Sequence, residues 1–192
     1  MSPSVESERP QRADAKRNRE RILESAREAF AADGAETQMD EVARLAGVGV
    51  GTVYRHFPTK ESLLGELVRQ KMTWMGENSR AALELDGEPF AVFADTLRRN
   101  VAVADGDAAI QFAMLGAGDA VWAYADEAVA EVVALTDELI TRAQRAGTMR
   151  TDVSALDIPM LMCGVCATMT HAKPEFDWRR HLELVIDSLR AR

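Results

Sequence analysis

Residues 39–60 read MDEVARLAGVGVGTVYRHFPTK, in which two short helical patterns are separated by a turn that contains glycine. Apolar residues in the first pattern recur at the spacing of one helix face, and Gly47 ends it by permitting a positive φ. The two patterns predict helices over Met39–Ala46 and about 50–57, joined as a helix-turn-helix. The small wedge that we expect to fix the angle between them consists of Val42, Ala43, Ala46, Val48 and Val53.

The remaining residues of the second short helix are expected to face outward, and their chemistry suits a DNA duplex. Thr52 and Tyr54 offer hydroxyl groups, and Arg55 can meet a phosphate or a guanine edge. Lys60 begins the next helix, where ammonium and amide groups can both face a phosphate. No acidic residue occurs between positions 47 and 60. The expected outward residues of the second helix are Val50, Gly51, Thr52, Tyr54, Arg55 and His56.

The alternative interpretation of this segment is a helical hairpin that does not bind DNA, with Tyr54 and Phe57 as core aromatics. Phe57 is expected in the core under either interpretation. The outward polar face on so short a helix favours the DNA reader.

Helical periodicity extends over most of the chain, and we find no convincing strand pattern and no internal repeat. Residues 1–13 are polar and contain two prolines, so we expect a disordered arm with a basic end. Thr59 and Asp177 are good N-caps for the helices that follow them. We therefore predict an all-α chain of about nine helices, with a reader domain over 14–75 and a larger domain over 76–192. Helices outside 39–60 are expected at 14–33, 60–80, 89–103, 108–115, 120–145, 154–169 and 177–190.

Charge is distributed unevenly along the 192 residues. Residues 1–60 hold ten Lys/Arg and ten Asp/Glu, whereas the other 132 residues hold 13 and 21, so the net charge of −8 lies in the second part. Two cysteines are too few for a disulfide framework, which fits a reducing compartment. No early segment has the apolar core of a signal peptide, and no run approaches the length of a membrane span. We expect a cytoplasmic protein without a membrane partner.

The segment around the helix-turn-helix closely resembles the tetracycline-repressor (TetR) family of bacterial transcriptional regulators. The resemblance covers about residues 17–75. The family usually places Thr or Ser just before the Met-Asp-Glu run, where it caps the helix and meets a phosphate; here Gln38 stands there, preceded by Thr37, and either is a candidate. The resemblance is carried by Phe30, Gly34, 39–43, 46–48, 52–57 and 60–64.

The resemblance implies roles for individual residues of the reader helix. Tyr54 and His56 are expected to contact the DNA backbone, and Thr52 a base edge or a phosphate. Positions 50, 51 and 55 are expected to read the sequence. Because Val50 and Gly51 offer few hydrogen bonds, Arg55, thymine methyl groups and DNA shape are expected to supply much of the preference.

The family's larger domain is expected to bind a small molecule and to form a homodimer through its last helices, with repression the commonest outcome. An effector would tilt helix 60–80 and change the spacing of two readers on a palindromic operator. Met and aromatic residues suit an adaptable apolar pocket, although ordinary core is the alternative for each. The candidate pocket residues are Trp74, Met75, Phe93, Phe112, Met114, Trp122 and Tyr124.

Small and apolar residues of the last two helices are the candidate dimer interface, with burial inside one subunit as the competing interpretation. The candidates are Met160, Leu161, Gly164, Val165, Ala167, Thr168, Leu182, Val185, Ile186 and Leu189.

Other functions have weaker support in the sequence. Cys163 and Cys166, with His171 nearby, are a possible metal or redox site, but both lie in an apolar helix and we expect buried structural thiols. No nucleophile–base set, metal signature or phosphate loop is present, so we expect no enzyme activity, no cofactor and no bound metal. A small helical enzyme is one alternative function, and a non-specific architectural DNA binder is the other.

Overall fold

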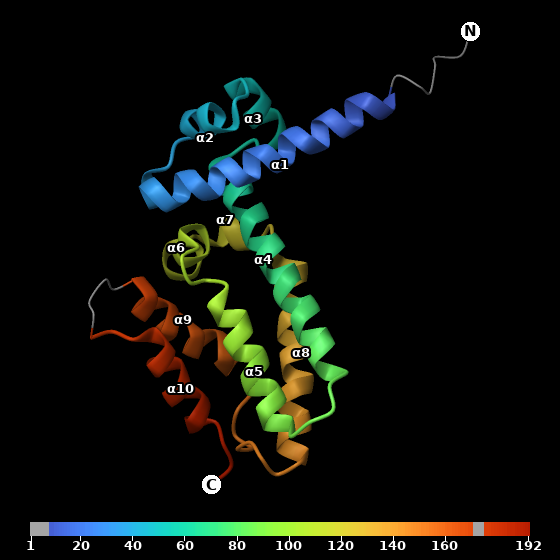
Figure 1. Cartoon of the computed structure of the whole chain (residues 1–192), viewed down its shortest axis with the longest axis vertical. Helices are drawn as coiled ribbons and strands as arrows, with labels where there is room; N and C mark the ends of the chain where they lie inside the picture. Colours follow the sequence, from blue (N-terminus) through green and yellow to red (C-terminus); the bar gives the residue numbers. More distant parts are fainter. Residues whose placement is uncertain (1–7, 171–174) are drawn as a thin grey trace.

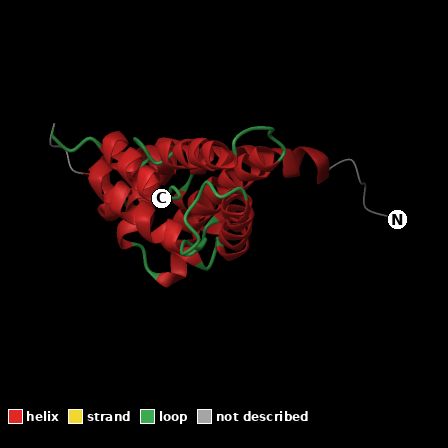
Figure 2. Cartoon of the chain, turned by 90° about the horizontal axis from the view of Figure 1, so that it is seen from below, coloured by secondary structure: helices red, strands yellow, loops and turns green. Residues whose placement is uncertain are grey.

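The computed structural model describes residues 8–170 and 175–192, apart from the side chains of residues 8–13 and 114–116. Regular structure in this part of the chain consists of ten α-helices and one short 3₁₀ turn, and no strand is present there (Figure 2). The predicted all-α class is confirmed, with one helix more than expected. None of the described helices combines the length and the apolar character that crossing a bilayer requires.

The first three α-helices lie at one end of the molecule, with α1 set across the top of α4 (Figure 1). They are α1 (Glu8–Asp33), α2 (Met39–Ala46) and α3 (Val50–His56), and a 3₁₀ turn (Gly34–Glu36) precedes α2.

Helix α1 begins earlier than the sequence predicts, so the expectation of a disordered arm is wrong for residues 8–13. The segment is rich in Glu, Arg, Gln and Ala, which favour helix, and Pro10 stands in the first turn, where a missing N–H costs no helical hydrogen bond. Residues 1–7 of the predicted arm lie outside the described part.

Helix α4 (Lys60–Leu83) connects this end to the rest of the molecule and runs beside α8 (Asp126–Arg145) (Figure 1). Its start is fixed by the predicted cap: the Thr59 hydroxyl accepts a hydrogen bond from the Ser62 N–H at 3.1 Å. The Ser62 hydroxyl accepts one from the Thr59 N–H, also at 3.1 Å. This reciprocal capping box fixes the residue at which α4 begins after α3.

The rest of the chain forms a bundle around α4 and α8. It contains α5 (Pro89–Ala102), α6 (Ala108–Gly116), α7 (Asp119–Trp122), α9 (Asp157–Thr170) and α10 (Trp178–Ser188), the last capped as predicted by Asp177, which accepts from the Arg179 N–H at 2.9 Å.

The single helix predicted over 120–145 is broken at residues 123–125. There the N–H groups of Tyr124 and Ala125 donate to carbonyls three residues back, at 3.3 and 2.8 Å. The segment contains no Gly or Pro that would end a helix, and it packs against α4, where Tyr124 lies against Gly65; we attribute the break to this packing.

Two apolar clusters form the core. The first joins α1–α4 to α6, α7 and the start of α8, and the second lies between α5, the rest of α8, α9 and α10. Helices α1–α3 therefore share a continuous core with α6 and α7. This core contains residues from both sides of the predicted domain boundary at 75/76.

Candidate functional site

The turn between α2 and α3 has the geometry that its sequence predicts. Gly47 has a φ of 61°, and the Val48 N–H donates to the Ala43 carbonyl at 3.1 Å. Arg21 of α1 donates a hydrogen bond to the Ala46 carbonyl, which satisfies one of the last acceptors of α2. The predicted wedge is confirmed, with Val42 and Val53 fully buried and Ala43, Ala46 and half-buried Val48 packed around them.

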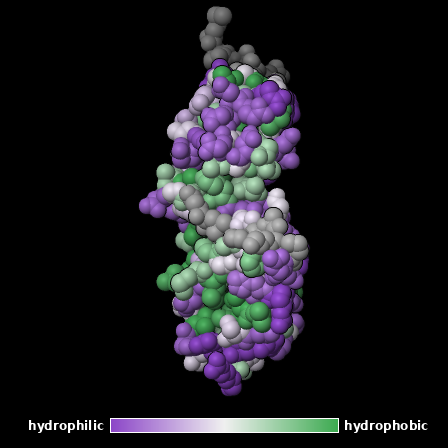
Figure 3. Space-filling model, turned by 90° about the vertical axis from the view of Figure 1, so that its left-hand side faces the viewer, coloured by the Kyte–Doolittle hydropathy of each residue, from purple (hydrophilic) through white to green (hydrophobic). Residues whose placement is uncertain are grey.

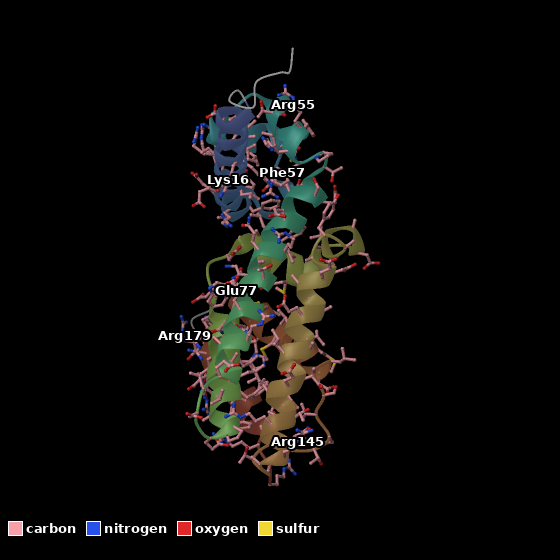
Figure 4. All side chains as sticks on the ribbon, turned by 90° about the vertical axis from the view of Figure 1, so that its right-hand side faces the viewer. Lys16, Arg55, Phe57, Glu77, Arg145 and Arg179 are labelled. Carbon is pink, nitrogen blue, oxygen red and sulfur yellow. The ribbon has the colours of Figure 1, made fainter. Side chains whose placement is uncertain are left out.

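One face of α3 points away from the protein. Tyr54 is 47% exposed and Val50 41% exposed, Gly51 and Arg55 are exposed, and Thr52 and His56 are half-buried. Figure 4 shows Arg55 at the outer end of the molecule and Phe57 inside it; Phe57 is buried as predicted. The alternative that places Tyr54 in the core is therefore wrong.

The basic side chains on and beside this surface differ in their hydrogen bonds and ion pairs. Arg55 forms no ion pair or hydrogen bond with any residue that the structure describes, so its guanidinium is available to a ligand. The Lys60 ammonium donates to the Ala35 carbonyl and lies 5.8 Å from the centre of the Phe30 ring. The nearby carboxylate of Glu41 pairs with Arg44 at 2.6 Å, a hydrogen bond that lowers the pKa of Glu41.

Thr37 was one of two candidates for the helix cap and phosphate contact, and this expectation is wrong. Its side chain is buried, and its hydroxyl donates to the carbonyls of Ala29 and Gly34, at 3.2 and 2.8 Å. Gln38 stands at the N-cap of α2 and is exposed, but its side chain makes no capping bond and its amide donates to the Glu36 carbonyl at 2.8 Å. Of the two, only Gln38 is accessible to DNA.

A surface hollow lies where the N-termini of α2 and α4 approach α3. Its volume is about 430 Å³, and it is lined by Thr37, Gln38, Met39, Asp40, Tyr54, Pro58, Thr59 and Lys60. Amide, phenol and ammonium groups, together with the Asp40 carboxylate, thus line one concave site beside the exposed face of α3.

A second feature, an apolar cavity of about 150 Å³, lies within the bundle. Residues from α4, α5, α6, α7, α8 and α9 and from the segments next to them surround it. They are Lys71, Met72, Met75, Leu97, Asn100, Val101, Val103, Ala104, Ile110, Trp122, Val129, Val132, Val133, Thr136, Ala155, Ile158, Pro159, Met162 and Cys166.

Of the six predicted pocket residues whose side chains the structure describes, Met75 and Trp122 line this cavity and the other four do not. Trp74 and Tyr124 are exposed on the surface, at 42% and 50%. Phe93 is buried in the second core cluster and Phe112 packs against the first, so both serve as core. The side chain of Met114 lies outside the described part. The cavity wall is mostly aliphatic. The aliphatic lining residues were not predicted from the sequence because they have the same pattern as the buried face of any amphipathic helix.

The predicted dimer residues divide into two groups. Val165, Leu182, Ile186 and Leu189 are buried in the second core cluster, so the expectation that they face another subunit is wrong and the competing interpretation holds for them. Met160 is 66% exposed and Gly164 is exposed; Leu161, Ala167, Thr168 and Val185 are half-buried.

The exposed apolar side of α9 and α10 includes residues that the sequence did not single out. Leu156 is 74% exposed and Leu184 52% exposed, and the two helices are joined by a 2.8 Å hydrogen bond between Thr168 and His181. Apolar residues gather on the lower part of this side in the space-filling view (Figure 3).

Cys166 is buried against the cavity and Cys163 is half-buried one helical turn earlier. Burial, with a smaller effect of Cys163, raises the pKa of the Cys166 thiol to about 11, so it stays protonated at neutral pH. No group of three or more metal-ligating side chains occurs among the described residues, and His171 lies outside them.

Comparisons with known proteins agree with this architecture. The model of bacterial regulatory proteins of the tetR family matches residues 22–67, and that of the transcriptional regulator SbtR-like C-terminal domain matches residues 88–191. The crystal structure of a TetR transcription regulatory protein from Mycobacterium vanbaalenii is 37% identical, with a TM-score of 0.62 over 95% of this chain and 100% of that one. The chain belongs to the TetR family of transcriptional regulators, and its helix-turn-helix is the DNA-binding part.

Other relatives match more locally or only in fold. The regulator SAUSA300_2515 of Staphylococcus aureus is 40% identical over 62 residues, so the match covers 32% of this chain and about a third, 34%, of that protein. RolR in complex with resorcinol is 19% identical with a TM-score of 0.63, over 94% of this chain and 91% of that one. Bacillus subtilis FadR in complex with stearoyl-CoA is 19% identical with a TM-score of 0.67, over 88% of this chain and 98% of that one.

Proposed function

We propose that this regulator acts as a homodimer that binds a palindromic operator and is released by a small-molecule effector, most simply as a repressor. The observation that carries the proposal is the outward face of α3, where Tyr54, Arg55 and Val50 are exposed and no acidic residue occurs from 47 to 60. A short helix of this kind, placed second in a helix-turn-helix, suits the major groove.

The hollow beside α3 would receive the DNA backbone. Gln38, Tyr54 and Lys60 line it; the N-terminus of α2 has no side-chain cap, and the N-termini of α2 and α4 both present the positive end of a helix dipole. These contacts fix the protein on the duplex, and Arg55 and Val50 would then meet base edges.

The exposed apolar side of α9 and α10 supports pairing with a second copy. Leu156 just before α9, Met160 of α9 and Leu184 of α10 each have more than half of their surface exposed, and Gly164 of α9 is exposed beside His181 of α10. An isologous contact through this side would relate two α3 helices by a two-fold axis, which requires half-sites about 34 Å apart on the operator.

Helix α4 joins the cavity to the reader. Lys71, Met72 and Met75 line the cavity, whereas Leu63 and Leu64 on the same helix are buried in the core beneath α1–α3. A ligand that displaces the lower part of α4 would move the reader as well, and differential binding to two states of this helix would shift the equilibrium. The fold neighbours solved with resorcinol and stearoyl-CoA are consistent with effector binding in this architecture.

Selection from a pool of random duplexes tests the proposal. A specific dimeric reader is expected to enrich one palindrome and to hold it at least ~10³-fold more tightly than random DNA at the same salt. Equal affinity for the selected and the random duplexes would instead support the architectural alternative.

A further inference from the structure

The cavity is small and almost entirely apolar. Its volume is about 150 Å³, and it is lined by aliphatic side chains, three methionines (Met72 and Met75 of α4 and Met162 of α9) and Trp122. An engineered protein cavity of roughly this volume with a similar lining stays dry and takes up benzene. The volume therefore fits a molecule of roughly six to ten non-hydrogen atoms, about one ring with a substituent.

The charged and ionisable groups at the wall are already neutralised. The Lys71 ammonium is 3.0 Å from an Asp107 carboxylate oxygen and donates to the Val103 carbonyl at 3.2 Å. Burial keeps the Cys166 thiol protonated, with a pKa raised to about 11. No carboxylate lines the cavity among the described residues. A charged ligand would lose its hydration there and find no counter-ion.

Two uncharged polar side chains interrupt the apolar wall. Asn100 of α5 is buried, with its amide nitrogen donating to Ser79 at 3.2 Å and its oxygen accepting from Asn78 at 2.6 Å, so its orientation is fixed. Thr136 of α8 lines the cavity, and its hydroxyl makes no hydrogen bond with any residue in the part that the structure describes. Asn100 keeps one amide N–H and one oxygen lone pair, whereas the whole hydroxyl of Thr136 is unpaired among the described residues, so Thr136 offers a ligand both a donor and an acceptor.

We infer that the effector is a small uncharged molecule, apolar apart from one hydrogen-bonding group, which binds between α4, α5, α8 and α9 with that group on the Thr136 hydroxyl. This inference rests on the proposed function and names the chemical class of its effector.

Four ring compounds of similar size test which chemical class of ligand binds: toluene (apolar), phenol (uncharged with a hydroxyl), benzoate (anionic) and benzylammonium (cationic). Each is titrated at neutral pH against the 192-residue protein, with the unfolding midpoint and the tryptophan fluorescence as readouts; Trp122, one of three tryptophans, lines the cavity. Toluene and phenol are expected to raise the midpoint and saturate. Benzoate and benzylammonium are expected to bind at least tenfold more weakly.

Thr136→Val keeps the shape of the side chain and removes the hydroxyl. It is expected to weaken phenol binding by about threefold to tenfold, the usual worth of one hydrogen bond, and to leave toluene binding unchanged. Val132→Phe, which fills the cavity, is expected to abolish binding of both compounds. Ala155→Leu fills it from another element and replaces Val132→Phe if that variant does not fold.

Three results overturn the inference: charged compounds that bind as tightly as neutral ones, an absence of binding by toluene and phenol, or binding unaffected by either filling variant. The proposed function is judged separately, because operator selection by the unliganded protein does not depend on the compounds. A protein that selects a palindrome but binds only charged or larger molecules would retain that function and refute this effector class.

Discussion

Gly65 of α4 and Tyr124, in the break between α7 and α8, are in direct contact: a β-carbon at position 65 would lie 2.6 Å from Tyr124 Cβ. This distance is far below a normal van der Waals separation, so no larger residue fits without moving the backbone of one helix. The contact sits where α4 leaves the reader and enters the bundle. It therefore fixes how the two parts of the molecule are placed relative to each other.

Gly65→Ala is expected to destabilise the protein by about 1–3 kcal/mol because the new methyl group overpacks this contact. In an exposed helix the same change would stabilise, since Ala is the better helix former by about 0.8–1 kcal/mol. Gly51→Ala of α3 is the matched control, because a β-carbon there meets nothing within 4 Å. Urea unfolding of both variants checks the prediction, and a Gly65→Ala protein as stable as the control would contradict it.

Arg55→Gln is expected to weaken operator binding, and the salt dependence shows which contact the guanidinium makes. Loss of a guanine contact should cost about 1–3 kcal/mol and relax the preference at one base pair. Loss of a phosphate contact should weaken binding to all sequences and reduce the salt slope by about one.

Arg145→Gln removes the same charge at the opposite end of the molecule (Figure 4) and is the control. Fluorescence anisotropy over a salt series with the selected palindrome measures both effects. An Arg55→Gln protein that matches Arg145→Gln in affinity and slope would show that α3 does not read DNA through this residue.

Local patterns in the sequence predicted the elements whose geometry is itself local. Gly47, the Thr59 cap and the apolar wedge of Val42 and Val53 were predicted because each depends on neighbours within a few residues. The break at Tyr124 was missed because it depends on a contact with Gly65, about 60 residues earlier, and nothing in its own segment disfavours helix.

Helical periodicity shows which face of a helix is apolar, but it does not show what that face packs against. The stripe of Leu182, Ile186 and Leu189 is equally apolar whether it faces the same subunit or a second one, and only the position of α5 and α8 decides the matter. Thr37 was similarly ambiguous, because a threonine hydroxyl can cap a helix or bond to carbonyls of the preceding turn. The pocket residues predicted from the sequence were mainly aromatic, whereas the cavity wall is mainly aliphatic.

Leu184→Glu is expected to convert the proposed dimer to monomers by placing a charge on the exposed apolar side of α10. Operator affinity should fall at least tenfold, because each half-site would then be bound without its partner. Leu85→Glu is the matched control, since Leu85 is 46% exposed and lies in the loop after α4. Sedimentation equilibrium gives the oligomeric state. If Leu184→Glu and a second variant, Met160→Glu, both remain dimeric, another surface forms the dimer.

Glu66 is expected to make the joint between α1 and α4 sensitive to acid. Its buried carboxylate accepts hydrogen bonds from Arg69 at 2.8 Å and Gln70 at 3.2 Å, and pairs with Arg19 of α1 at 3.1 Å. Burial alone would raise the pKa of Glu66, but the hydrogen bonds and charges of Arg69 and Arg19 outweigh it and hold the pKa below the usual 4.5. Because the pKa is lower in the folded state, the carboxylate stabilises the protein above about pH 4.5, and this stabilisation is lost as the pH falls through the folded-state pKa.

Glu66→Gln is therefore expected to lower stability at neutral pH and to flatten the loss of stability between pH 4.5 and more acidic values. Urea unfolding over a pH series measures this against Glu127→Gln, which removes an exposed carboxylate that pairs with no described residue. Parallel pH profiles for the two variants would mean that Glu66 does not contribute to the acid dependence. A flattened profile in Glu66→Gln alone would assign that dependence to the α1–α4 joint, because the charge removed is the same in both proteins.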